Sequence, residues 1–503
     1  MNGVNEESVA GKALRGSVLN IGSSIITSLS GFLRSVLLAG LLLPEDFGVV
    51  ALALFFISLA MQVQRFGLGK AYILRDGDSS ASRETFASLH MGLTAVAACL
   101  ALMATPILVR LYPEQPQLVP ILIVLVLFEA LDAFNSVAAT ILAKDLRFRR
   151  VAVLGVASSL SMTVIAPLAA LAGAGVWALV VERVIGTVIR AIGLWVVKRP
   201  WRPRFRIDRS LARWYLKFGS ILFANDVQGF FLDRFDDFWT GTFLGTTALG
   251  FYSRAYDFAR YPRRMLSGPL VKVFLPTFAS LQNDRLRLSK AFYRVSSVIV
   301  RIGFLVFGTF ALVAPEFIRI FLGDKWMPMA FAFRLMMVYA LFDPLTSICG
   351  NLLAVVGQPQ IVTKIQPVRL VLFVPAVIFL GIRFGINGVA VAADIMLGVG
   401  VALLLWQARR FVDFSVWRIF LVPSLAIGLG ALVTISVEHL FLLPAGDWWR
   451  LVVKVIIAAL VYSATSSLLE REQYTRAFRL GWQLLSTKAL PSVISQGSDS
   501  ASP

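Results

Sequence analysis

The chain consists largely of apolar stretches that are each about as long as a lipid bilayer is thick. A helix needs ~20 mainly apolar residues to cross the hydrocarbon core. Stretches of this length occur at residues 17–40, 47–67, 86–110, 118–142, 150–172, 175–197, 214–242, 248–275, 291–314, 329–356, 365–384, 387–408, 416–438 and 448–469. Only 15% of the residues are charged, whereas soluble proteins hold about a quarter. The sequence therefore predicts an all-α integral membrane protein with about fourteen transmembrane helices.

The basic residues between these spans predict their orientation. Lys and Arg gather in every second loop, and the intervening loops hold few of them. Because cytoplasmic loops are enriched in Lys and Arg, the alternation predicts that both termini are cytoplasmic. The same rule explains a formal net charge of +19 without nucleic acid. The most basic loop, residues 197–217, suits the anionic surface of the inner leaflet, and nucleic-acid binding is the weaker interpretation.

The two halves of the chain resemble each other. The segment LLLPEDFGVVALA at 41–53 aligns with FLGTTALGFYSRA at 243–255, and GAGVWALVVE at 173–182 echoes GINGVAVAAD at 385–394. The order and spacing of these matches predict a duplicated six-helix unit, an architecture common in transporters. We therefore expect two pseudo-symmetric six-helix bundles at 1–197 and 214–410, joined by a basic linker at 198–213. Helices 13 and 14 follow at 411–470, and 471–503 is a polar cytoplasmic tail.

The seventh span contains an unusual density of charge in the stretch NDVQGFFLDRFDDFW at 225–239. At 100° per residue, Asp226, Asp233 and Asp237 project within about 40° of one another. Asn225 and Asp236 lie near this stripe in projection. Each ionised side chain that faced lipid near the midplane would cost ~3 kcal/mol. The stripe must therefore face protein or water.

Further charges of both signs lie well inside other spans. The eighth span contains Arg254, Asp257, Arg260, Arg263 and Arg264. Other spans contain Arg34, Glu129, Asp132, Arg301, Asp343 and Asp394. Structural ion pairs would explain any one of them, but one or two pairs suffice to hold helices together, and buried pairs stabilise weakly. The whole set therefore favours a wide hydrated cavity between the two halves. For Arg183, Arg190 and Arg369, near the ends of their spans, we expect snorkelling to the interface.

The chain lacks the motifs of common catalytic and metal sites. Its two cysteines and two histidines are scattered, and we expect neither a metal site nor a cofactor. The segment GLGKA at 67–71 lacks the upstream Gly and the hydroxyl of a nucleotide-binding P-loop, and no HExxH, CxxC or GxSxG is present. The loops predicted on the outer side are short. We therefore expect a transporter rather than an enzyme.

The segment at 37–75 carries a family resemblance. It resembles the opening of polysaccharide-repeat-unit flippases, which belong to the multidrug/oligosaccharidyl-lipid/polysaccharide exporter superfamily. The matching core is Pro44, Glu45, Asp46, Phe47 and Gly48, followed by the Gly67-Leu68 step. The glycines of GAGVWAL look like the turn before helix 6 in this family. In topology the resemblance covers nearly the whole chain, whereas the sharp motif covers about forty residues.

The resemblance implies that the protein moves an undecaprenyl-diphosphate-linked oligosaccharide across the bacterial inner membrane. The product would be a surface polysaccharide such as exopolysaccharide, capsule or O-antigen, with a polymerase and chain-length machinery as partners. Guanidinium groups suit a diphosphate, so we expect Arg34, Arg254, Arg260, Arg264 and Arg301 to contact it. Asn225, Asp226, Asp233 and Asp237 would hold these arginines or bind sugar hydroxyls, and Trp239 would offer an aromatic face. Asp132 and Asp394 are candidates for coupling to protons or sodium.

Three other functions stay open from the sequence. A drug–cation antiporter of the same superfamily would favour an acidic cavity, against which the arginines argue. A lipid II flippase shares the need for cations, but its motifs are less similar to PEDFG. A membrane polymerase or ligase is the alternative from the enzyme class.

Overall fold

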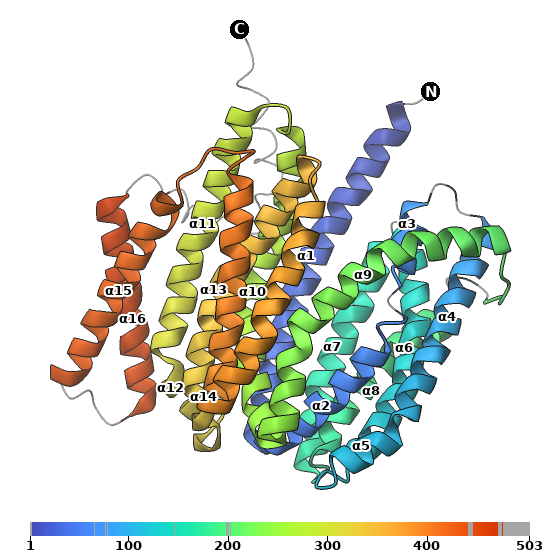
Figure 1. Cartoon of the computed structure of the whole chain (residues 1–503), viewed down its shortest axis with the longest axis horizontal. Helices are drawn as coiled ribbons and strands as arrows, with labels where there is room; N and C mark the ends of the chain where they lie inside the picture. The colour runs from blue at the N-terminus through green and yellow to red at the C-terminus, as the bar shows by residue number, and fades with distance from the viewer. Residues whose placement is uncertain are drawn as a thin grey trace. The chain divides into compact units, whose positions relative to one another are not determined.

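The computed structural model describes residues 3–64, 66–75, 77, 79–145, 147–197, 201, 203–440, 446–470 and 475. Within these ranges every regular element is a helix and there is no strand (Figure 1). Nine helices in the described part of the chain are long and apolar enough to cross a membrane. The predicted all-α membrane fold is confirmed.

The helices follow one another with short connections. The first half contains α1 (Gly3–Leu41), α2 (Pro44–Ala60), α3 (Leu68–Leu74), α4 (Ser80–Met103), α5 (Thr105–Leu111), α6 (Leu118–Lys144), α7 (Phe148–Leu171) and α8 (Trp177–Ala191), which continues as a π-helical turn, Ile192–Val197. The second half contains α9 (Arg209–Trp239), α10 (Thr246–Ser280), α11 (Arg285–Leu312), α12 (Ala314–Phe321), α13 (Ala330–Val355), α14 (Gln360–Ala408), α15 (Val416–Leu440) and α16 (Asp447–Leu469). A π-helical turn, Thr240–Leu244, follows α9, and a 3₁₀-helix, Asp324–Met329, precedes α13.

The predicted count of fourteen spans is not confirmed, and the discrepancy has identifiable causes. Helix α2 has 17 residues, and α8 has 15 residues before it continues as a π-helical turn. Helices α9 and α10 are long but carry too many charges to qualify as apolar spans. Helix α14, with 49 residues, covers two predicted spans at once.

Helix α14 is interrupted by a glycine. Gly385 has φ 59° and ψ −141°, a conformation that only glycine adopts readily. Three residues later, a Cβ built on Gly388 would lie 1.9 Å from the carbonyl oxygen of Leu380. The break therefore falls between the predicted spans 365–384 and 387–408. The aligned position in the first half, Gly173 between α7 and α8, also has a positive φ, 85°.

The other pair of aligned segments meets in space. A Cβ built on Gly48 in α2 would lie 1.7 Å from the carbonyl oxygen of Thr246, and one built on Gly250 in α10 would lie 1.8 Å from that of Pro44. The first turns of α2 and α10 thus cross at backbone contact, and each provides a glycine to the other. We call this the glycine crossing. Neither position has room for a side chain.

Two compact units result from the packing. The first combines residues 1–269, 321–333 and 363–396, and the second combines 270–320, 334–362 and 397–503. In the first unit α1 packs along α7, and α7 packs on α8. Helix α4 packs on α6, and with α3 and α9 these two helices enclose a buried cluster that includes Tyr72 and Phe86. In the second unit α15 lies beside α16 and both contact α11 (Figure 1). This division does not test the predicted domain boundaries, which stay a prediction.

The glycine crossing predicts a large effect of a single methyl group. Gly48→Ala and Gly250→Ala should each destabilise the purified protein by about 1–3 kcal/mol. The new Cβ would overlap a backbone oxygen, and a change of side-chain rotamer cannot move that atom away. Thermal unfolding followed by tryptophan fluorescence measures the effect.

Gly40→Ala is the matched control, since nothing lies within 4 Å of a Cβ at Gly40 and alanine favours the helix by up to about 1 kcal/mol. A melting temperature of Gly48→Ala equal to that of Gly40→Ala would contradict the crossing.

Candidate functional site

Helices α9 and α10 carry the predicted acidic stripe and arginines, and a tight turn connects them. The carboxylate of Asp208 caps α9 by accepting the backbone N–H groups of Ser210 and Leu211, at 2.9 and 3.0 Å. At the other end of α9, the connection to α10 ends at Gly245, whose φ of 90° favours glycine. Chain reversal at this glycine sets the end of α9 beside the start of α10. Charged residues of both helices can therefore meet there.

A buried polar cluster occupies this meeting point. The hydroxyl of Tyr252 in α10 donates to Asp236 Oδ2 of α9 at 2.5 Å, and Arg234 Nη1 donates to Asp237 Oδ2 at 2.9 Å. Asp236 and Asp237 are 8% and 6% exposed, and the backbone N–H of Asp237 donates to Asp236 Oδ1. Asp236 was not among the predicted site residues. Its only sequence signal was its place in an aspartate doublet near the stripe.

The remaining polar residues of the stripe are not used in this cluster. Asp233 is exposed, and Asp226 is half-buried with no ion pair among the described residues. Asn225 Oδ1 and Gln228 Oε1 are buried atoms for which the described part of the chain supplies no hydrogen-bond partner. The structure thus separates the predicted stripe into Asp237, which is paired, Asp233, which is exposed, and Asp226, which lies near the buried oxygens of Asn225 and Gln228 in the sequence.

The predicted role of Trp239 as an aromatic face for sugar is wrong for this conformation. Trp239 is 3% exposed, and Gly381 of α14 packs against its ring. A Cβ on Gly381 would lie 2.2 Å from the indole. Trp239 is therefore a packing residue between α9 and α14.

Arg34 of α1 is held by residues of the first half. Its Nε pairs with Glu182 Oε1 of α8 at 2.8 Å, and Nη1 donates to Ser159 O and Thr163 Oγ1 of α7 at 3.3 and 3.4 Å. These contacts connect three helices of one bundle and leave Arg34 12% exposed. Its contact with substrate stays a prediction. No local pattern identifies Glu182 as the partner, although Glu182 ends the aligned segment GAGVWALVVE.

Arg254 of α10 connects the family motif to α1. Its guanidinium forms an ion pair with Asp257, donates to Ser35 Oγ at 3.3 Å, and lies 4.6 Å from the centre of the Phe47 ring. Phe47 is buried and also packs edge-on against Trp326. Cation–π contact of this kind is worth about 0.5–2 kcal/mol.

The other motif residues have structural roles that explain their types. Pro44 begins α2, where its missing N–H costs nothing. Asp46 Oδ2 accepts the backbone N–H of Leu43 at 2.9 Å, and Glu45 accepts from Gln115 Nε2 at 3.0 Å. Gly48 forms the glycine crossing. The PEDFG motif thus builds the start of α2 and its contact with α10.

Arg260 and Arg264 differ from the other arginines of α10. Their guanidiniums lie 5.1 Å from the Tyr256 ring and 6.0 Å from the Tyr261 ring, respectively. Tyr261 is fixed by its hydroxyl, which donates to Gly31 O of α1 at 2.9 Å. No carboxylate among the described residues forms an ion pair with either arginine. Being four residues apart, they occupy one side of α10 as two cations supported by aromatic rings.

The two candidate coupling residues have different surroundings. Asp132 of α6 accepts from Arg190 of α8 at 2.7 Å, with both side chains about 40% exposed. Arg190 thus has a carboxylate partner, and its predicted snorkelling to the interface stays a prediction. Asp394 of α14 is half-buried, and its Oδ1 has no hydrogen-bond partner in the described ranges.

In the second unit the buried charges neutralise one another. Arg301 is 3% exposed, pairs with Glu470 and donates to Ser297 O. Lys454 contacts Glu316 at 2.7 Å and Glu438 at 2.8 Å. These pairs connect α11, α12, α15 and α16. The pairing of Lys454 was not predicted, and its only signal in the sequence is a lone Lys in an apolar span. The substrate role of Arg301 stays a prediction. Within the described residues no group of three or more His, Cys, Asp or Glu could hold a metal ion.

Comparisons with known proteins agree with one another. Residues 37–331 match the polysaccharide biosynthesis protein family. The succinoglycan biosynthesis transport protein ExoT of Rhizobium meliloti is 29% identical over 66% of this chain and 67% of its own length. The lipopolysaccharide biosynthesis protein WzxC of Escherichia coli is 23% identical over 75% and 77%, respectively.

Solved structures show the same fold at low identity. An inward closed conformation of the lipid II flippase MurJ has a TM-score of 0.70 at 15% identity, covering 90% of this chain and 99% of that one. An inward-facing multidrug resistance MATE transporter of the MOP superfamily has a TM-score of 0.59 at 18% identity, covering 78% and 98%. The family match covers more than half of the sequence and includes the PEDFG motif. The chain is therefore a multi-pass membrane protein that belongs to the polysaccharide biosynthesis protein family and has the fold of MOP-superfamily transporters.

Proposed function

We propose that this protein is a flippase that moves lipid-linked oligosaccharide repeat units across the bacterial inner membrane for surface polysaccharide synthesis. The relatives named for succinoglycan and lipopolysaccharide biosynthesis support the pathway class, and the first of them is named a transport protein. The likeness to MurJ and MATE structures supports a transporter fold. Both termini are cytoplasmic in this proposal, and the downstream partners are a polysaccharide polymerase and its chain-length machinery.

The observation that carries the proposal is the arginine pair Arg260 and Arg264. A guanidinium inside a membrane span costs ~3 kcal/mol when it faces lipid, so each needs water or an anion. Neither forms an ion pair with a carboxylate in the described part of the chain, and both are supported by tyrosine rings. Two guanidiniums one turn apart suit the oxygens of a diphosphate, which each can bind through two parallel N–H groups. We assign the diphosphate of undecaprenyl-diphosphate to this pair, with Arg254 nearby.

The sugar portion of the substrate requires polar atoms that are not used elsewhere. Asn225, Asp226 and Gln228 supply them on α9, since two of the three have buried oxygens without a partner in the described residues. Asp236 serves instead to join α9 to α10 through the hydroxyl of Tyr252, and Asp237 is paired with Arg234 within α9. The substrate's prenyl chain stays in the lipid while its head group crosses. Alternating access of the two repeats, 1–197 and 214–410, moves the head group from one side to the other.

The alternative functions make different demands on this site. A drug–cation antiporter needs a net acidic site, whereas Arg260 and Arg264 place two cations on tyrosine rings of α10. Transport of cationic dyes would favour that alternative. Rescue of a strain that lacks lipid II flipping would favour a lipid II flippase. Polymer formation in liposomes that contain only this protein would establish an enzyme.

Removing either free cation should impair export. In a bacterial strain whose own repeat-unit flippase is deleted, Arg260→Ala and Arg264→Ala should each lower surface polysaccharide about 10- to 100-fold. A hydrogen bond to a charged group contributes about 1.5–3 kcal/mol, which corresponds to that range in rate. Arg183→Ala, an exposed arginine of α8, is the control and should export normally. Loss of the protein from the membrane, rather than loss of export, would assign the arginines a structural role.

The acidic stripe should separate into two phenotypes. Asp237→Asn removes a partner of Arg234 and should lower the free energy of unfolding by about 1–3 kcal/mol, since Arg234 is partly exposed. Asp226→Asn should leave the melting temperature unchanged and lower export several-fold. Thermal unfolding and quantification of surface polysaccharide, on both variants, measure this. Equal loss of stability in both would contradict the assignment of Asp226 to substrate.

Asp394 is the stronger of the two candidates for ion coupling, because Asp132 is already paired with Arg190. In proteoliposomes loaded with the lipid-linked substrate, Asp394→Asn should make flipping insensitive to an imposed proton or sodium gradient. Asp132→Asn should keep the gradient response and lower thermal stability. A normal gradient response of Asp394→Asn would exclude it as the coupling residue.

A further inference from the structure

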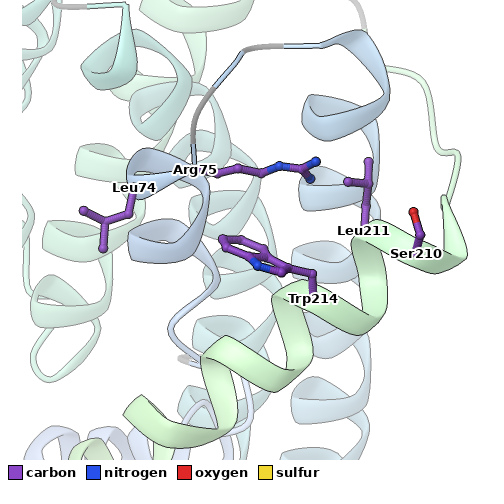
Figure 2. A pocket seen from close by; sticks show the side chains of 5 residues that line it. All are labelled: Leu74, Arg75, Ser210, Leu211 and Trp214. Atoms are coloured by element: carbon purple, nitrogen blue, oxygen red, sulfur yellow. The ribbon is translucent and has the colours of Figure 1, made fainter.

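A cavity of about 500 Å³ lies between α3 and the first turns of α9, away from the site described above. Leu74, Arg75, Ser210, Leu211 and Trp214 line it. Figure 2 shows the side chain of Arg75 extending from the end of α3 toward α9, with the indole of Trp214 beneath it. The guanidinium lies 5.5 Å from the centre of that ring. The volume is within the range of pockets that bind small molecules, ~300–1,000 Å³. We call it the α3–α9 pocket.

Both walls of the pocket are fixed by hydrogen bonds. Lys144 Nζ caps the end of α3 by donating to the carbonyl oxygens of Tyr72, Arg75 and Gly77, at 2.7, 2.9 and 3.2 Å. It also lies 4.4 Å from the Tyr72 ring, and burial raises the pKa of that phenol to about 12, so the lysine faces a neutral ring. On the other wall, Asp208 holds the first turn of α9. The pocket is therefore preformed.

Arg75 lacks an anionic partner in this pocket. Its Nη1 is a buried atom without a hydrogen-bond partner, and no described carboxylate forms an ion pair with it. Asp208 does not fill this role, because its carboxylate accepts the N–H and hydroxyl of Ser210 and the N–H of Leu211. The pKa of Asp208 is lowered mainly by the Ser210 hydroxyl, and Arg75 contributes least. A buried guanidinium nitrogen without an acceptor is costly, so an anion would be stabilised here.

The surroundings of the pocket are both apolar and basic. Leu74 is 68% and Trp214 41% exposed, and nearby in sequence Phe205 and Ile207 are exposed by about 60%. Exposed basic residues alternate with them at Arg204, Arg206, Arg209 and Arg213. Tryptophan and arginine together are typical of the membrane interface, and basic segments on the cytoplasmic side attract anionic lipids at about 1 kcal/mol per residue. A small soluble anion would have no use for the exposed apolar side chains.

We propose that the α3–α9 pocket binds an anionic phospholipid of the inner leaflet. Its phosphodiester accepts hydrogen bonds from Arg75 and the Ser210 hydroxyl, and its acyl chains extend along Leu74 and Trp214. The bound lipid would fasten α3 to the start of α9, which is the helix that carries the acidic cluster. The proposal depends on the predicted membrane orientation but not on flippase activity.

The test uses the purified full-length chain in detergent. Native mass spectrometry and thermal unfolding are recorded with added dioleoyl phosphatidylglycerol, dioleoyl phosphatidylcholine or inorganic phosphate. We expect phosphatidylglycerol to be retained and to raise the melting temperature, and the other two probes to have little effect. Arg75→Gln should weaken phosphatidylglycerol binding about tenfold. Arg213→Gln removes an exposed arginine of α9 that does not line the pocket. This variant should bind phosphatidylglycerol as the unaltered chain does.

Several results would overturn the proposal. Phosphatidylcholine bound as tightly as phosphatidylglycerol would exclude a role for the anionic charge, and inorganic phosphate bound as tightly would indicate a site for a free anion. Equal weakening by Arg75→Gln and Arg213→Gln would indicate surface charge alone. Leu74→Gln provides a second variant, since Leu74 is exposed and its replacement should leave the fold intact while weakening lipid binding. Because the readout is lipid retention, failure here is distinct from failure of the flippase proposal.

Discussion

A charged group inside a membrane protein must have a partner or water, and this constraint organises most of the structure. Several charges in the described part of the chain have a partner from another helix or turn: Arg34 with Glu182, Arg190 with Asp132, Arg301 with Glu470 and Lys454 with two glutamates. Each of these pairs fixes two or more helices to one another. Arg260 and Arg264 differ from these residues, because they lie over tyrosine rings and form no ion pair with a described carboxylate. In the proposed function, this leaves both guanidiniums available to a substrate anion.

The same helix pair, α9 and α10, combines rigid and open parts. At one end, Tyr252 and Arg234 satisfy the aspartate doublet, and the glycine crossing brings α10 against α2 at backbone distance. Further along α10, Arg260 and Arg264 are supported by rings rather than by carboxylates. The proposed function needs such a division, because the proposed diphosphate site must be positioned by elements that do not yield when the ligand binds.

The sequence predicted the fold class well, because apolar length and loop charge follow directly from the thickness and polarity of the bilayer. It also pointed to Gly48 and Gly250 and to Gly173 and Gly385 as corresponding positions, since glycine marks backbone constraints that survive in both halves. It did not identify which charges pair. Glu182 lies 148 residues from Arg34 and Glu316 lies 138 residues from Lys454, and these pairings depend on helix packing that no local pattern encodes. The role of Trp239 could not be predicted for the same reason, since its ring packs against Gly381 of another helix.

The glycine crossing constrains two distant segments of the sequence together. The segments at 41–53 and 243–255 each supply one glycine to the contact. A side chain added at either glycine would collide with the main chain of the other segment. Because the obstacle is main chain, no change of side chain in one segment can compensate for the loss of the glycine in the other.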